Sequence, residues 1–417
     1  MVSMGKKVIC YIQAFDCEKT IEAAMRSVQN QTYENWLCFI LSNGNRNTVE
    51  APNWSLDVIK SVAARDPRFI VLNKRTNSLD MYVPTLYYLA NCFPDSYICS
   101  LDADDEYQSD FFARGIALAE EHDLDIVACG TEIRLKENEE TVDSTLLSRR
   151  EVQEDLVIRE GDFTRQFLVY KPFFNEMWGK LYRAGLFGPQ HSWAYAQRHF
   201  FRHFLPDTLF TMDNLSRSRA IGILSGTSHR FYQYRRRKES NATLAANSHA
   251  AGHKARQPFH RNTFSVYDTH ETIMEFLRTR GEISSDLNEY MQAVLIGWFG
   301  DYYMRTLLPV QNEETFAKLA AKLVFHPKFD ESIRYRDSGK YNNLREYEAR
   351  IAFCRKLRNT ALGQKAVRNR GEGRRADLLC SVATAKKLDR IIQKLDKTLE
   401  DLLALQAEIQ GQTGGRG

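Results

Sequence analysis

The chain has 417 residues, more than one compact core usually holds, so its length predicts two or three domains. Hydrophobic residues make up 43% of the sequence and charged residues 26%, which excludes a largely disordered protein. The formal net charge is only +4, so the overall charge gives no support for a nucleic-acid-binding protein.

The eight cysteines form no CxxC pair, and the first residues lack the charged, apolar and small-residue regions of a signal peptide. These features predict reduced thiols in a cytoplasmic protein. The most apolar run, 293–300, is far shorter than the ~18 residues that a membrane-spanning helix needs. Any contact with a membrane is therefore expected to be peripheral, at its inner face.

Strands and helices alternate along the first 130 residues, where short apolar runs are separated by segments with helical apolar spacing. The expected strands are Lys7–Gln13, Trp36–Leu41, Phe69–Leu72, Tyr97–Leu101 and Asp125–Ala128. The expected helices are Glu18–Gln29, Leu56–Ala64, Val83–Cys92 and a helix that is capped by Ser109 and ends near Glu121. This alternation predicts an α/β fold with a mostly parallel sheet covered by helices, whose ligands bind at the carboxyl ends of the strands.

The character of the sequence changes after this region. Glu132–Asp155 is polar and weakly periodic, as in an excursion or edge hairpin, and Phe163–Tyr234 returns to apolar segments that complete the same domain. Arg235–Asn262 is typical of a loop, and Thr263–Leu357 is mainly helical. We therefore expect a catalytic-type α/β domain at 1–245, a helical accessory region with a basic stretch at 246–375, a C-terminal amphipathic helix at 376–410 and a flexible tail at 411–417.

Near the C-terminus, mainly apolar residues are spaced alternately three and four apart over more than three heptads, which predicts a coiled-coil-like helix. We expect this seam to pair between subunits and make the protein a homo-oligomer; packing back onto the helical region is the alternative. The seam consists of Ala385, Leu388, Ile392, Leu395, Leu399, Leu402, Gln406 and Ile409.

Arg355–Arg375 contains eight Lys or Arg and a single acid, Glu372. Such a stretch suits an anionic membrane surface or phosphate groups, and it suits a solvated helix face equally well.

The strongest local signal for chemistry is a cluster of carboxylates directly after a buried strand. Asp102, Asp104 and Asp105 follow Tyr97–Leu101, and such a cluster is costly unless a cation or hydrogen-bond donors compensate it. Mg²⁺ and Mn²⁺ prefer carboxylate and phosphate oxygens. The motif therefore predicts a divalent-metal site for a ligand's phosphates. The alternative is a turn with helix-capping aspartates, which Asp105 fits best.

Several motifs along Lys7–Thr243 resemble the family 2 glycosyltransferases, which have the GT-A fold. The most specific is the run Ser27-Val28-Gln29-Asn30-Gln31-Thr32-Tyr33 at the end of the first helix. The other matching segments are Ala14-Phe15-Asp16, Asp66-Pro67-Arg68-Phe69, Leu101-Asp102-Ala103-Asp104-Asp105, Trp178-Gly179-Lys180-Leu181-Tyr182-Arg183, Met212-Asp213-Asn214 and Tyr232-Gln233-Tyr234-Arg235.

The resemblance implies an inverting, metal-dependent glycosyltransferase that moves a sugar from a nucleoside-diphosphate sugar, in first place a UDP-sugar, to a hydroxyl of a glycan or polyprenyl-linked glycan. Mn²⁺ or Mg²⁺ would be held by Asp102 and Asp104, and Asp213 would be the catalytic base. The nucleotide-binding positions that it implies are Ala14, Asp16, Asn43, Asp102, Ala103 and Arg235.

The sequence departs from the family pattern at three places. Asn43 stands where a carboxylate often contacts the nucleotide base, which leaves the identity of the base open. Asn77-Ser78-Leu79-Asp80 lacks the usual glycine, and Met212 replaces the glutamate that commonly precedes the base.

Other side chains allow both a functional and a structural interpretation. Glu176 is a second candidate base, and Trp178 suits either an acceptor sugar or the core. The arginines 235–237 suit either contact with a pyrophosphate or a solvated loop. We expect His229 to be a structural residue, with metal binding as the alternative. The histidines 199 and 203 lack a third ligand with zinc spacing, so we interpret them as structural.

Two other functions are alternatives to a transferase. A nucleotidyltransferase would carry a glycine-rich loop after the first strand, where this chain has Gln13-Ala14-Phe15-Asp16. The non-enzymatic alternative is a catalytically inactive glycan-binding or scaffold subunit that oligomerises through its C-terminal helix.

Overall fold

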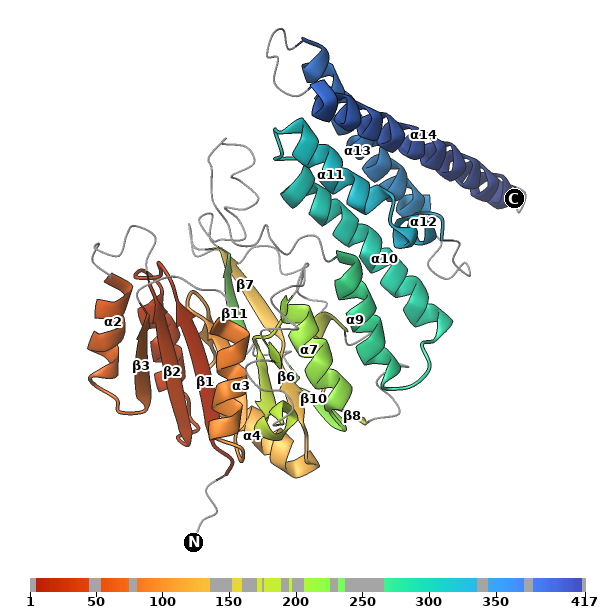
Figure 1. Ribbon diagram of the computed structural model, residues 1–417. Coiled ribbons are helices and arrows are strands. Elements are labelled where there is room, and N and C mark those ends of the chain that lie inside the picture. The colour runs from red at the N-terminus through yellow and green to blue at the C-terminus, as the bar shows by residue number, and fades with distance from the viewer. Residues whose placement is uncertain are drawn as a thin grey trace. The chain divides into compact units, whose positions relative to one another are not determined.

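The structure is a computed structural model that describes residues 5–44, 54–74, 81–135, 152–159, 171–174, 176–188, 195–196, 206–225, 232–236, 266–335, 344–370 and 378–414. The chain divides into two compact units (Figure 1). The first unit comprises residues 1–240 with 272–283, and the second comprises 241–271 with 284–417.

The first unit is built on a sheet whose described strands follow the order β3-β2-β1-β4-β9-β6-β10-β8. The first four strands of the chain run parallel, as does the pair β6 and β10, whereas β9 and β8 run antiparallel to their neighbours. The predicted mostly parallel sheet is therefore confirmed. The strands are β1 (Val8–Ala14), β2 (Trp36–Asn43), β3 (Phe69–Lys74), β4 (Tyr97–Asp102), β6 (Ile126–Ala128), β8 (Leu156–Arg159), β9 (Lys180–Arg183) and β10 (Ala220–Ile223).

Helices cover both faces of this sheet, because alternate side chains of the buried strands point to opposite sides. The helices α1 (Ile21–Gln29), α2 (Trp54–Ala63) and α4 (Phe111–His122) share one apolar core with Val8, Cys10 and Ile12 of β1. On the opposite side, Tyr11 contacts Tyr82 at the start of α3 (Tyr82–Cys92), and Tyr87 of α3 contacts Phe210 of α7 (Pro206–Arg217).

Two of the helix starts that differ from the prediction have a clear structural cause. The first helix begins at Ile21 rather than Glu18, because Asp16 has a positive φ of 46° and the backbone turns before Ile21 donates to the Cys17 carbonyl. The fourth helix begins at Phe111, and the Ser109 carbonyl accepts from the Thr32 amide instead of Ser109 capping the helix.

A second, smaller sheet has the order β5-β11-β7, formed by β5 (Glu106–Tyr107), β11 (Tyr232–Arg236) and β7 (Thr131–Leu135). β7 contains the start of the polar region that we expected to be an excursion or edge hairpin, and β11 continues through Arg235 and Arg236 into the segment expected to be a loop. The rest of that polar region, 136–151, lies outside the described residues, and β8 follows it as an antiparallel strand at the edge of the large sheet.

The second unit is helical. Ser284 caps α10 and Asn312 caps α11 through side-chain acceptors, the usual chemistry of a helix start. A short π-helical segment, Tyr303–Leu307, follows α10. The helices are α9 (Val266–Arg278), whose first residues belong to this unit, α10 (Ser285–Tyr302), α11 (Glu313–Val324), α12 (Pro327–Ile333), α13 (Leu344–Arg370) and α14 (Leu378–Gly414).

The heptad seam of the last helix packs within the chain. Helix α14 lies against α13 and α11, and Leu388, Leu395, Leu399 and Leu402 are buried there. This is the alternative that the sequence left open, packing onto the helical region. The helix also continues to Gly414, past its expected end at 410. Among the described residues, no helix is both long and apolar enough to span a lipid bilayer.

Candidate functional site

Three of the predicted nucleotide-binding residues meet at one edge of the large sheet. Ala14 ends β1, Asn43 ends β2 and Asp102 ends β4, and β1 lies between the other two strands. The strand register pairs Gln13 with Asp102 and Ala14 with Ser42, so the three strand ends are adjacent. Ala14 and Asn43 are fully buried, whereas Asp102 is partly exposed. This edge is the expected place for a ligand of a parallel sheet.

The turn after β4 gathers the three aspartates. The Asp105 amide donates to the Asp102 carbonyl over 3.0 Å, which closes the turn. The Thr20 hydroxyl donates to the Ala103 carbonyl over 2.9 Å and ties the turn to the start of α1. As a result, carboxylate oxygens of Asp102, Asp104 and Asp105 lie within 4.8 Å of one another.

The members of this cluster differ in their surroundings. Asp102 and Asp104 are partly exposed, whereas Asp105 is fully buried and accepts a 2.7 Å hydrogen bond from the Tyr232 hydroxyl. The ring of Tyr232 stacks on Trp178 with ring centroids 4.3 Å apart. Asp105 is thus held in the turn by a buried hydrogen bond, the N-cap position of α4 belongs to Asp110, and Trp178 packs on a buried tyrosine.

The electrostatics of Asp102 fit a cation site. Burial and the negative charges of Asp104 and Asp207 raise the pKa of Asp102 to about 7, although a 3.3 Å hydrogen bond from the Tyr82 hydroxyl favours its charged form. A divalent cation would relieve this accumulation of negative charge. The oxygen ligands of Asp102 and Asp104 are also the type that Mg²⁺ and Mn²⁺ prefer, so the residues fit such an ion.

Asp16 lies just beyond β1, where the chain leaves the sheet. Its positive φ of 46° turns the backbone, and the next amide, that of Cys17, donates to the Ser55 hydroxyl of α2 over 3.0 Å. Asp16 therefore lies in the turn that follows β1, and the bond from Cys17 to Ser55 ties that turn to α2.

Asp213, the predicted catalytic base, lies in the interior of α7 and is only 2% exposed. One carboxylate oxygen accepts from the Tyr87 hydroxyl over 3.0 Å, and the other pairs with Arg217 one turn along the helix and accepts from the Tyr195 hydroxyl over 3.3 Å. Both oxygens are thus engaged by donors. Such a carboxylate stabilises the packing of α3 against α7, and an acceptor hydroxyl would have to displace one of these donors.

Asp207 is a candidate that the sequence analysis missed. It lies in the first turn of α7 and its side chain is exposed. Its negative charge contributes to the raised pKa of Asp102. The available signal was Pro206-Asp207, because proline in a first helical turn followed by an acid marks a helix start.

Glu176 and Arg235 are the remaining predicted residues that the structure describes. Glu176 lies near Asp207, and its backbone carbonyl accepts from the Lys180 ammonium over 2.6 Å. The backbone of Arg235 pairs with Arg134 in the small sheet. His199, His203, His229 and Arg237 lie outside the described residues.

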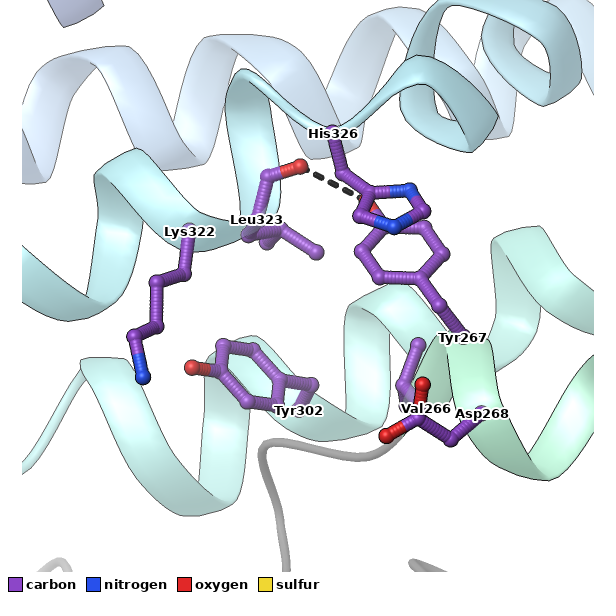
Figure 2. Close-up of a pocket in the computed structure, with 7 residues that line it drawn as sticks. All are labelled: Val266, Tyr267, Asp268, Tyr302, Lys322, Leu323 and His326. Atoms are coloured by element: carbon purple, nitrogen blue, oxygen red, sulfur yellow. Dashed lines mark hydrogen bonds between the residues drawn. The ribbon is translucent and has the colours of Figure 1, made fainter.

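A cavity of about 180 Å³ lies within the helical unit, where the chain carries none of the predicted site residues (Figure 2). The Tyr267 ring stacks on His326 with centroids 3.8 Å apart, and its hydroxyl donates to the Leu323 carbonyl over 2.6 Å. These contacts fasten α9 to the end of α11 and the start of α12, so we assign this cavity a place in helix packing.

Comparison with known proteins gives a family match for the N-terminal part. The sequence model described as "Glycosyl transferase family 2" matches residues 9–200. No protein with a curated description matches the chain.

Crystal structures of S. aureus TarS are similar in fold at low identity. One TarS structure is 14% identical with a TM-score of 0.43, over 81% of this chain and 56% of that one. TarS 1–349 in complex with UDP-GlcNAc is 13% identical with a TM-score of 0.45, over 78% of this chain and 89% of that one. The chain thus spans little more than half the length of the longer TarS chain.

Proposed function

We propose, from the match of residues 9–200 to the glycosyl transferase family 2 model, that the protein is a metal-dependent, inverting glycosyltransferase. It moves a sugar from a nucleoside-diphosphate sugar, with UDP-sugars the first to test, to a hydroxyl of a glycan or polyprenyl-linked glycan. The observation that carries this proposal is the carboxylate cluster of Asp102, Asp104 and Asp105 at the carboxyl end of β4, beside Ala14 and Asn43.

Asp102 and Asp104 would hold a Mn²⁺ or Mg²⁺ ion, which supplies positive charge to the diphosphate as it leaves. The nucleotide would bind beside Ala14, Asp16, Asn43 and Ala103. Arg235 is a further candidate, for contact with the phosphates of the nucleotide. Asp105 acts indirectly, because its bond to Tyr232 fixes the turn that presents its two neighbours.

The base takes the proton of the acceptor hydroxyl while that oxygen attacks the anomeric carbon and the bond to the nucleoside diphosphate breaks. Asp213 is the base that the sequence favours, and its contacts with Arg217, Tyr87 and Tyr195 argue for a supporting role. Asp207 has the better properties for the base, because it is exposed and its negative charge acts on Asp102. Glu176 lies beside it as an alternative.

The first experiment is a calorimetric titration of UDP into the full chain with and without Mn²⁺, repeated with Asp104→Ala. We expect binding that requires both the ion and Asp104. Asp95→Ala is the matched control, because Asp95 is an exposed acid just before the opposite end of the same strand. Binding of UDP should survive this change.

Other outcomes divide the alternatives. If GDP or CDP binds in place of UDP, the base recognised at Asn43 differs from uracil while the transferase proposal stands. If no nucleotide binds with either metal, the transferase proposal fails, and an inactive glycan-binding or scaffold subunit becomes the better interpretation.

The proposed partners beyond the donor are the acceptor glycan, a peripheral membrane surface and a second copy of the chain. The last is tested by light scattering, since the buried seam of α14 makes a monomer compatible with the fold. A mass of one chain at all concentrations would exclude the homo-oligomer.

A further inference from the structure

The hairpin of α13 and α14 concentrates the positive charge of the protein. Residues 355–397 contain 13 Lys or Arg and four Asp or Glu, a net charge of +9, whereas the whole chain carries +4. The remaining residues therefore carry a net charge of −5. The two helices pack side by side within the second unit (Figure 1).

The two described acids of the segment 355–397 pair with bases across the hairpin. Asp396 of α14 pairs with Arg358 of α13, and Asp389 pairs with Lys365. These two bridges hold the helices together and pair both carboxylates with cations, while the side chains of Asp396 and Asp389 stay 41% and 43% exposed. The other two acids, Glu372 and Asp377, lie outside the described residues.

Among the described residues of 355–397, the most exposed charged residues are basic. Arg355 and Lys356 of α13 are exposed, and so are four basic residues of α14. The four are Lys386, Lys387, Arg390 and Lys397. A helix face on which acids and bases alternate is typical of a surface that only contacts solvent. A face with an excess of cations attracts an anionic surface.

Apolar side chains accompany these cations. Val382 of α14 is 44% exposed and Leu362 of α13 is 37% exposed. Farther along α14, Leu403 is 41% exposed and lines a groove of about 490 Å³ together with Arg355 of α13. Arg358, Asp396 and Glu400 also line this groove, so its charges are mixed and the surplus of cations lies outside it. Cations beside apolar side chains are the composition of helices that lie in a membrane interface.

We propose that the outer face of the α13–α14 hairpin, defined by Arg355, Lys356, Lys386, Lys387, Arg390 and Lys397 with Leu362 and Val382, docks on an anionic lipid surface. The cations meet lipid phosphates, and the two apolar side chains enter the acyl boundary. This contact is peripheral and independent of donor binding in the first unit. It goes beyond the transferase proposal, because it places a membrane-attached acceptor within reach of an enzyme that binds the same membrane.

The test is sedimentation of the full chain with vesicles of phosphatidylcholine alone or with about 30% phosphatidylglycerol, at about 0.1 M salt. We expect binding to the anionic vesicles only, weakening as salt rises. The triple variant Lys386→Gln, Lys387→Gln, Arg390→Gln should bind roughly 100-fold more weakly, since each cation near such a surface contributes about fivefold.

The matched control is Lys60→Gln, Arg278→Gln, Lys318→Gln, which removes the same charge from exposed positions elsewhere. It should sediment like the wild type. The pair Leu362→Ser, Val382→Ser should reduce binding less than the triple variant and leave the remainder more sensitive to salt. Metal-dependent UDP binding, measured in parallel, should be unchanged in all these variants, which separates this inference from the transferase proposal.

Equal sedimentation with neutral and anionic vesicles would overturn the proposal. So would equal loss of binding in the two triple variants, or binding to a short DNA duplex without binding to anionic vesicles.

Discussion

The hydroxyl of Tyr232 donates to the carboxylate of Asp105 over 2.7 Å, across 127 residues of sequence. The same hydroxyl lies 3.4 Å from the backbone nitrogen of Asp102. The small sheet brings Tyr232 to this position, because β11 pairs with β5 directly after the aspartate turn. One tyrosine therefore joins the last strand of the described α/β unit to the residues that would hold the metal.

Replacing Tyr232 with phenylalanine should weaken both the fold and the donor site. The change leaves the buried Asp105 carboxylate without this donor, which should lower the free energy of unfolding by about 2 kcal/mol. Metal-dependent UDP binding should weaken as well, since the turn loses its anchor. Tyr107→Phe is the control: it removes a 2.7 Å bond to the neutral Ser100 carbonyl in the same core, and we expect a smaller loss. Equal effects in the two variants would mean that the charge of Asp105 is unimportant.

The ion pair of Asp213 and Arg217 should matter for stability. Asp213→Asn keeps the volume of the side chain and leaves Arg217, whose side chain is 20% exposed, without its charged partner. We expect a loss of about 3 kcal/mol in denaturant unfolding. Glu22→Gln removes an exposed pair with Arg26 at the same helical spacing and should cost less than about 0.5 kcal/mol. A loss as small as that of Glu22→Gln would mean that the ion pair is not needed for stability, and Asp213 would again be a candidate for the catalytic base.

Asp207→Asn should lower kcat by about 10²–10⁴-fold and leave the unfolding transition unchanged, because the side chain is exposed and acts as the base. Asp57→Asn, at an exposed acid in the first turn of α2, should alter neither quantity. The measurement is turnover of the donor that the nucleotide titration identifies. Full activity of Asp207→Asn, with loss of activity in folded Asp213→Asn, would return the role of the base to Asp213.

The strand ends of the large sheet were predictable because local pattern and tertiary role agree there. β1, β2 and β4 are apolar runs that parallel pairing buries on both faces, so Ala14, Asn43 and Asp102 had to fall at one edge. The prediction was weaker where burial depends on distant partners. Local sequence marks Asp207 only as an acid at a helix start, and the burial of Asp213 depends on Tyr87, which lies 126 residues away along the chain.

The small sheet illustrates the same limit. Its strands come from segments that are short and polar, and β11 is stabilised by pairing with β5 and β7 rather than by its own pattern. The helical seam of α14 was recognised correctly, but a heptad pattern specifies an apolar partner without saying which chain supplies it.

The affinity of the site for Mn²⁺ should depend on pH through Asp102, whose pKa of about 7 is raised by burial and by the charges of Asp104 and Asp207. Below pH 7 the ion must displace a proton, so the Kd should rise about tenfold per pH unit, and above pH 7 it should level off. The metal-free protein should lose stability as pH rises from about 4 through 7, because unfolded aspartate has already released its proton there. Asp102→Asn should remove that loss. A Kd for Mn²⁺ that stays the same from about pH 5.5 to about pH 8 would contradict the prediction.

The packing of α14 determines whether unfolding depends on protein concentration. Leu395 is fully buried against the helical unit, so Leu395→Ala should lower the unfolding free energy of this unit by about 2–5 kcal/mol. Leu403, which is 41% exposed on the same helix, is the control, and Leu403→Ala should cost much less. If the seam packs within one chain, the unfolding midpoint is independent of protein concentration in the wild type and in both variants. A midpoint that rises with concentration, and a larger rise for wild type than for Leu395→Ala, would show instead that Leu395 also contributes to pairing between chains.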